Sequence, residues 1–207
     1  MDAEGVSQMT NPHEPPPTGL AFREAMAFAA SSVHVVTSIG DHGDAGITAT
    51  AICAISDAPP SLLVCLNRRS YAHSVISRSG VLAVNNLSYD QLALADEFAG
   101  RGSRSMIDRF ARARWTRGST GTPLLADCLA SFDCRVDHSM TVGTHELFIC
   151  AVVDIVRATP RRGLAYAARR FFSVDLDRSA GSSSLAEPGH RPRVHDRAGG
   201  EPRAGEV

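Results

Sequence analysis

Residues 33–67 read VHVVTSIGDHGDAGITATAICAISDAPPSLLVCLN, and this stretch decides the fold class. VHVVTSI (33–39) and ITATAICAIS (47–56) are rich in strand-forming residues and flank the turn-rich DHGDAG, which together predict a β-hairpin. Pro59 and Pro60 interrupt the hydrogen-bonding ladder. SLLVCLN (61–67) is a continuous apolar run, which predicts a strand buried on both faces. The stretch therefore indicates a mainly β protein.

The segments on either side add short helices and more strands. Helices are predicted after a cap at Thr18, over 71–79, and after Ser88, where Gln91 completes a capping box and Gly100 ends the helix. Further strands are predicted in VLAVNNLS, ADCLASFDCRVDH, HELFICAVVDIVRA and LAYAARRFFSV. Many strands separated by turns, with few short helices, favour an antiparallel Greek-key barrel over a Rossmann sheet.

Both ends of the chain have the composition of unfolded polypeptide. Residues 1–18 contain a run of three prolines, and residues 177–207 are rich in Gly, Ser, Pro and charged side chains. Such segments bury too little apolar surface to offset the entropy of ordering them. We expect one folded domain at 19–176 between two disordered segments, which fits a chain of 207 residues.

Charge and hydropathy exclude several classes of partner. The net charge is −1 and the isoelectric point is near 6.7, so binding to nucleic acid or to an anionic membrane is not expected. The mean hydropathy is −0.07, and the sequence has neither a long apolar run nor a signal peptide at its start. We expect a soluble, cytoplasmic protein.

Residue usage also excludes some chemistry. All 21 basic residues are arginine, which rules out a P-loop and a pyridoxal-phosphate imine because both need a lysine. The five cysteines show no CxxC spacing, so reduced thiols are expected and a structural metal site is not. GxSxG, HExxH and GxGxxG motifs are all absent from the sequence, although a dispersed catalytic triad stays possible.

Three short polar motifs remain, at the predicted ends of strands and helices. They are TATA (48–51), NRRS (67–70) and FAGR (98–101). Each alone is explained by local structure, as a strand of small residues, a helix cap and a helix end. Together they suggest more, because small residues let a flat ligand approach the backbone while arginine and helix-start N–H groups bind phosphate.

The order of these motifs, followed by Trp115, TGTPLL, GTHELFICAVV and AYAARRF, resembles the short-chain flavin reductases over residues 20–174. These are the reductase components of two-component flavin monooxygenases and have a split-barrel flavin-binding fold. The resemblance implies a homodimer that reduces FMN or FAD with NADH or NADPH and releases the reduced flavin to a separate monooxygenase. Hydride transfer is chemistry of the two cofactors, which agrees with the absence of a local catalytic motif.

The resemblance also implies roles for single residues. His145 falls where the nicotinamide is expected to stack and is the implied catalytic residue. Ser70 and Arg101 are expected to hold the flavin phosphate. Arg170 and Phe171 either cover the flavin or only complete the last strand. The residues implied to line the flavin are Thr48, Ala49, Thr50, Ala51, Cys65, Leu66, Asn67 and Phe98.

Two departures from the family pattern stand out. Many members have GDH where this chain has Gly143-Thr144-His145, so a carboxylate that would fix the imidazole tautomer is missing. The ending Arg169-Arg170-Phe171 looks like reductases that serve antibiotic pathways. Arg161, Arg162 and Arg169 are candidates for a 2′-phosphate contact, but solvated surface arginines are the default interpretation.

Two other functions stay open at this point. One is a flavin- or haem-handling split-barrel protein without reductase turnover. The other is an oxygenase that keeps its flavin and acts on a small substrate directly, although the sequence offers no second domain for such a substrate.

Overall fold

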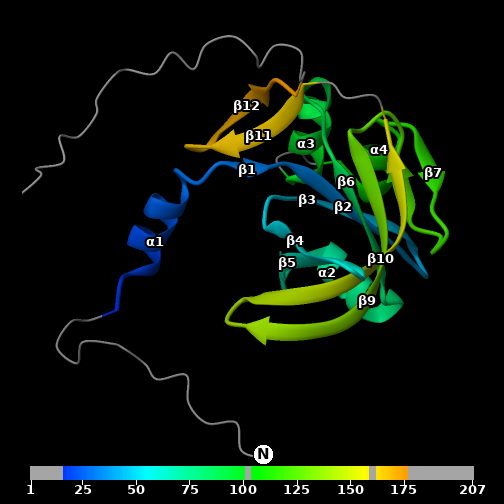
Figure 1. Cartoon of the computed structure of the whole chain (residues 1–207), viewed down its shortest axis with the longest axis horizontal. Coiled ribbons are helices and arrows are strands. Elements are labelled where there is room, and N and C mark those ends of the chain that lie inside the picture. Colours follow the sequence, from blue (N-terminus) through cyan, green and yellow to red (C-terminus); the bar gives the residue numbers. More distant parts are fainter. Residues whose placement is uncertain (1–15, 101–103, 159–161, 177–207) are drawn as a thin grey trace, which may run out of the picture. The chain divides into compact units, whose positions relative to one another are not determined.

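Strands dominate the computed structural model, which describes residues 16–100, 104–158 and 162–176 (Figure 1). The strands are β1 (Ser31–Ser32), β2 (His34–Gly40), β3 (Gly43–Ala49), β4 (Ile52–Asp57), β5 (Pro60–Asn67), β6 (Val81–Asn86), β7 (Trp115–Arg117), β8 (Pro123–Leu125), β9 (Ala130–Val142), β10 (His145–Arg157), β11 (Gly163–Ala167) and β12 (Arg170–Val174). The helices are α1 (Gly19–Met26), α2 (Tyr71–Ser79), the 3₁₀ turn η1 (Tyr89–Gln91), α3 (Leu92–Phe98) and α4 (Met106–Phe110). The predicted mainly β architecture is confirmed.

Seven strands form one antiparallel sheet in the order β3-β2-β6-β9-β10-β5-β4. The first and last strands of this order follow each other in the chain, and only Thr50 and Ala51 separate them. A main-chain hydrogen bond of 2.9 Å from Cys65 N to Ala51 O holds this corner beside β5. The sheet therefore curls until its two ends approach each other, and the predicted antiparallel Greek-key split barrel is confirmed.

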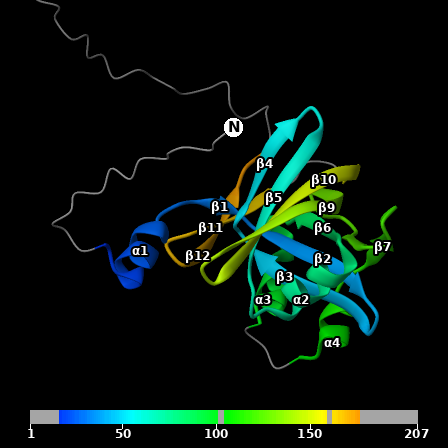
Figure 2. The same cartoon turned by 90° about the horizontal axis from the view of Figure 1, so that it is seen from below.

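The segment predicted as one strand over 47–56 is corrected by this topology. Its first part pairs with β2, as the hairpin prediction required, but its second part leaves at Thr50 and pairs with β5 instead. Pro59 and Pro60 do not interrupt a ladder. Ala58 and Pro59 form the turn of the β4–β5 hairpin, and Pro60 begins β5 opposite Asp57; the hairpin projects from the barrel in Figure 2. The predicted continuous strand is broken at Thr50 and Ala51, because the chain crosses there from one end of the sheet to the other.

A cluster of buried side chains fills the barrel between α2 and the main sheet. Its members are Val36, Leu62, Val64, Leu66, Ile76, Leu82, Val84, Cys134, Phe148 and Cys150. Strand β5 contributes alternate residues to this core, and the residues between them are half-buried or exposed, so its predicted burial on both faces is wrong. The sequence of β5 is continuously apolar because its second face is also partly shielded from solvent.

The last predicted strand, residues 164–174, is also corrected. It forms the β11–β12 hairpin, which joins β1 in a separate three-stranded sheet. Ala168 and Arg169 make the turn, with φ of 46° and 60° in the left-handed region. Residues with a side chain rarely adopt this region, so the residue types at this position do not indicate a turn.

The predicted helix starts are confirmed. The Thr18 hydroxyl accepts a hydrogen bond from Ala21 N at 3.2 Å before α1, and the Gln91 side chain accepts one from Ser88 N at 3.0 Å before α3. Gly100 follows α3 with φ of 75°. Local capping chemistry therefore sets where these helices begin and end.

A buried carboxylate fixes the loop before β8. Asp133 on β9 is fully buried and accepts hydrogen bonds from Thr120 N at 2.8 Å, from the Thr122 hydroxyl at 2.8 Å and from the Ser119 hydroxyl at 2.9 Å. Burial raises the pKa of Asp133, but the donors of this loop outweigh it and leave the pKa lowered. Neutral hydroxyl and amide donors thus keep this carboxylate charged.

The predicted disordered segments lie outside the described residues, apart from residues 16–18. Within the described ranges, no helix has the length and apolar character needed to span a membrane.

Candidate functional site

The corner between β3 and β4 is held in place from two sides. The Thr48 hydroxyl donates to Ala95 O on α3 at 2.6 Å, and Ala51 O accepts the hydrogen bond from Cys65 N. Ile52 N donates to Thr50 O at 3.0 Å, which tightens the turn. The predicted motif at 48–51 is therefore a fixed corner whose small side chains leave the backbone accessible.

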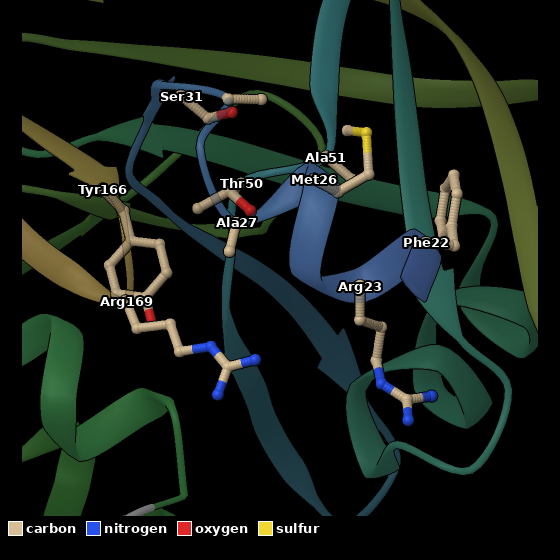
Figure 3. A pocket seen from close by; sticks show the side chains of 10 residues that line it. Phe22, Arg23, Met26, Ala27, Ser31, Thr50, Ala51, Tyr166 and Arg169 are labelled. Carbon is tan, nitrogen blue, oxygen red and sulfur yellow. The ribbon is translucent and has the colours of Figure 1, made fainter. Parts of the chain in front are cut away.

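An open pocket of about 640 Å³ lies at this corner, between α1 and the turn of the β11–β12 hairpin (Figure 3). Thr50 and Ala51 supply its floor, and the Tyr166 ring and the Arg169 side chain lie on one side. The residues that line it are Phe22, Arg23, Met26, Ala27, Ala29, Ser31, Thr50, Ala51, Tyr166 and Arg169. Apolar and aromatic surface beside two guanidinium groups suits a flat aromatic ligand that carries negative charge.

The NRRS motif forms a rigid start to α2. Ser70 N donates to Asn67 O at 3.0 Å, and the Asn67 side chain accepts from Arg69 N at 2.9 Å. The Ser70 hydroxyl accepts from His73 N at 3.2 Å, so Ser70 is a helix N-cap. A phosphate contact from the same hydroxyl stays a prediction, and its chemistry is compatible because a hydroxyl also donates.

His145 lies beside this helix start. It is the first residue of β10 and pairs in register with Asn67 at the end of β5. Arg68 N donates to Thr144 O at 3.0 Å, which joins the tip of the β9–β10 hairpin to the NRRS motif. The sheet topology creates this proximity, which the order of the residues along the chain does not indicate.

The Thr144 hydroxyl supplies the partner that the missing carboxylate would have provided. It lies 2.9 Å from His145 Nδ1. A neutral hydroxyl can accept from or donate to Nδ1, so it orients the ring without adding charge.

Two of the predicted residues at the end of β5 differ in their exposure. The Leu66 side chain is only 2% exposed and belongs to the barrel core. Cys65 is half-buried on the other face of β5, and burial raises the pKa of its thiol. Of the two side chains, that of Cys65 is the one available to a ligand.

Phe98 also has a core position. Its side chain is 1% exposed and packs edge-on against Phe110 and Trp115, with ring centroids 5.2 and 5.9 Å away. A Cβ on Gly46 would meet the Phe98 ring at 2.5 Å, so α3 lies directly on β3. Phe98 therefore supports the corner from beneath, and its implied contact with the flavin stays a prediction. Arg101 lies outside the described residues.

The C-terminal hairpin presents different residues to the pocket from those that the sequence indicated. Phe171 packs on Tyr166 with centroids 5.1 Å apart, and the Arg170 guanidinium lies 5.4 Å from the centre of the Phe172 ring. Tyr166 and Arg169 line the pocket instead. The unexpected turn at Ala168 and Arg169 explains why Arg169, and not Arg170, borders the pocket.

His34 is a buried polar residue that sequence reasoning missed. Its side chain is 9% exposed, lines a second cavity of about 450 Å³ with Thr50 and Asn86, and its Nδ1 has no hydrogen-bond partner among the described residues. Burial lowers the pKa of His34 to about 4. The only sequence signal is a histidine within an apolar strand.

Comparison with known proteins shows the family. Residues 26–175 match the family described as "flavin reductase like domain". The chain is a member of the flavin reductase-like family. Within this family it is 48% identical to the protein named FMN reductase (NADH) RutF 2 of Methylorubrum extorquens strain PA1. That match covers 151 residues, 73% of this chain and 87% of the relative.

Solved flavin reductases share the fold. The flavin reductase PheA2 is 29% identical with a TM-score of 0.70, over 77% of this chain and 99% of PheA2. BorF, the flavin reductase component of a bacterial two-component tryptophan halogenase, is also 29% identical with a TM-score of 0.70, over 76% of this chain and 98% of BorF. The split-barrel flavin reductase fold is therefore established for this chain.

Proposed function

We propose that the protein is an NADH-dependent FMN reductase that transfers a hydride from NADH to FMN and releases the reduced flavin. The observation that carries the proposal is the corner of small residues at Thr50 and Ala51, which forms the floor of an open pocket. The chain that contains this pocket is similar to FMN reductases. NADH, FMN and a proton give NAD⁺ and reduced FMN, so no other reactant is needed. The protein's part is to bind the two cofactors in contact and orient them.

The site is proposed to extend from this corner to the start of α2. In this proposal Thr48, Ala49, Thr50 and Ala51 lie along the flavin ring and ribityl chain, with Cys65 and Asn67 beside them. Phe98 and Leu66 stabilise these strands from the core. Tyr166 and Arg169 border the ring end of the site, and Arg170 and Phe171 shape the hairpin that presents them.

The end of β5 and the start of α2 are proposed to bind the flavin phosphate, with the nicotinamide stacked on the flavin ring between this end and the corner. Ser70 and the first N–H groups of α2, together with Arg101, are proposed to bind the flavin phosphate. His145 is proposed to orient the nicotinamide, with its own ring held by Thr144. Both groups lie at the end of β5, which supports one continuous site.

FMN and NADH are favoured over FAD and NADPH by the names of the similar curated relatives. FAD stays an alternative substrate because the site is open at its surface. The suggestion of an antibiotic pathway, which rested on the Arg-Arg-Phe ending, has no support from these relatives.

The reduced flavin is proposed to go to a separate flavin-dependent monooxygenase. The two-component arrangement named for BorF supports this proposal. Five free thiols favour a reducing compartment, so we place the reaction in the cytoplasm.

A homodimer is proposed because several large apolar side chains of the described residues are exposed. Ile55 on β4 is 51% exposed, Ile155 on β10 is 47% exposed, and Phe22 on α1 is 61% exposed. Such surface is commonly covered by a second subunit. Light scattering after gel filtration would test this: the mass of a single chain would contradict the dimer.

The first experiment is to follow NADH and NADPH absorbance with FMN, FAD and riboflavin. Flavin-dependent loss of the NADH signal, fastest with FMN, is expected. Flavin binding without turnover would favour the binding-protein alternative. Flavin retained through gel filtration, with product formed in the absence of any partner, would favour a one-component oxygenase.

A further inference from the structure

A carboxylate lies close to the proposed phosphate end of the site. Glu146 follows His145 on β10 and faces the first turn of α2. Its Oε2 lies 2.7 Å from His73 Nε2, and the backbone N–H of the same His73 donates to the Ser70 hydroxyl. One residue therefore separates the Glu146 carboxylate from the N-cap of α2.

This carboxylate is held on both sides. The Ser139 hydroxyl on β9 donates to Oε1 at 2.7 Å while His73 occupies Oε2. The Glu146 and His73 side chains are 16% and 13% exposed, so water screens them only in part. The carboxylate is thus fixed in position by groups from two different elements.

Glu146 is ionised over the whole neutral range. The hydrogen bonds from His73 and Ser139 lower its pKa, and the nearby Arg68 guanidinium contributes to the same shift. A flavin phosphate at Ser70 would bring a charge of roughly −1.5 to −2 close to this anion. The two like charges repel each other, and the Arg68 guanidinium offsets part of that repulsion.

We propose that Glu146 is a specificity-determining residue that weakens binding of the flavin phosphate and keeps FMN exchangeable. The inference rests on the proposed function, because it needs the phosphate at the start of α2. A reductase that delivers its product to another protein must release it on every turnover. A fixed anion beside the phosphate serves that release without touching the reacting ring.

Glu146→Gln tests the proposal by a gain of affinity. The amide keeps the size of the side chain and hydrogen-bonding groups toward His73 and Ser139, but it removes the charge. FMN should bind about fivefold more tightly and dissociate more slowly, whereas riboflavin, which has no phosphate, should bind as before. Flavin fluorescence titrations measure both dissociation constants, and added salt should reduce the difference for FMN.

Asp44→Asn is the matched control. Asp44 on β3 forms an ion pair with Arg117 at 2.7 Å, so its loss changes the net charge by the same amount at a different ion pair. Its FMN and riboflavin affinities should both stay at the wild-type values. A gain for FMN in both variants would show a general charge effect and overturn the proposal.

Other outcomes also decide the matter. If Glu146→Gln weakens FMN, or changes FMN and riboflavin equally, the carboxylate acts only on local structure and the proposal is wrong. If the wild-type chain binds FMN but oxidises no NADH, the proposed reductase function fails while the binding comparison still tests Glu146. A folding defect cannot imitate the expected result, because it would not tighten binding of FMN alone.

Discussion

The two ends of the proposed flavin site are built in different ways. At the α2 end, Asn67, Ser70, His73 and Glu146 are joined by hydrogen bonds that link α2, β5, β9 and β10. At the corner end, the pocket is lined by α1, none of whose residues is buried, and by the turn of the β11–β12 hairpin. The rigid end suits a phosphate of fixed geometry, whereas the open end suits two flat rings that bind in turn.

Acid should lower the stability of the folded chain through the corner end, and this is the largest effect that we expect. His34 lies in the cavity beside Thr50, and its pKa is about 4 in the folded chain against 6.5 in the unfolded one. The unfolded chain binds more protons between these values, so stability is complete above pH 6.5 and is lost as the pH falls toward 4. The loss amounts to about 3 kcal/mol.

Urea unfolding at a series of pH values measures this loss. His34→Asn should flatten the slope in that window, because an amide does not titrate. An unchanged slope in the variant would assign the acid sensitivity to other groups.

A bulky side chain at the corner should obstruct the ring site directly. Ala51→Phe places a ring on an exposed position of the pocket floor, so the fold should tolerate it. Displacing a flat substrate from its contact geometry should lower flavin-dependent NADH oxidation by about a hundredfold. Steady-state absorbance gives the rate, and a wild-type melting temperature confirms the fold. Full activity would exclude the corner as the ring site.

At the rigid end, the Ser70 hydroxyl can be removed. Ser70→Ala should weaken FMN binding by about 1 kcal/mol if the hydroxyl also contacts the phosphate. Riboflavin binding should change less, since it has no phosphate. Equal losses for FMN and riboflavin would mean that Ser70 acts only as the cap of α2.

The smallest expected effect is on NADH binding and leaves FMN binding unchanged. Thr144→Val removes the hydroxyl beside His145 Nδ1 and keeps the shape of the side chain. The KM for NADH should rise about threefold, and the dissociation constant of FMN should stay unchanged. Thr144→Ser should restore the KM. An unchanged KM for NADH would show that Thr144 has no part in the nicotinamide site.

Strand patterns predicted the barrel because each strand carries its own signal. Alternation, capping residues and turn composition are local, and they located β2, β3, α2 and α3 within a few residues. The sequence patterns did not predict two positions at which a strand is interrupted. Thr50 and Ala51 carry no turn signal, and Arg169 has a left-handed conformation that arginine rarely adopts. In both places tertiary packing overrides local preference.

The site was predicted in part, through the ordered motifs of a family. That order marked the β3–β4 corner and the start of α2, but it could not show that Thr144 bonds to His145 or that Glu146 meets His73. These contacts depend on the register between β5 and β10, which is a property of the whole sheet. A helix-end motif likewise does not reveal that the aromatic ring of Phe98 lies beneath β3.

The order of the main sheet has a consequence for how the chain folds. The β2–β3, β4–β5, β9–β10 and β11–β12 hairpins each close over a short length of chain, whereas β5–β10 and β6–β9 join distant segments. Long loops must close before those pairings stabilise anything, so folding should be slow, on the order of milliseconds to seconds. Until β10 docks against β5, the helix start at Ser70 has no His145 beside it, and the assembled site is among the last features that the chain acquires.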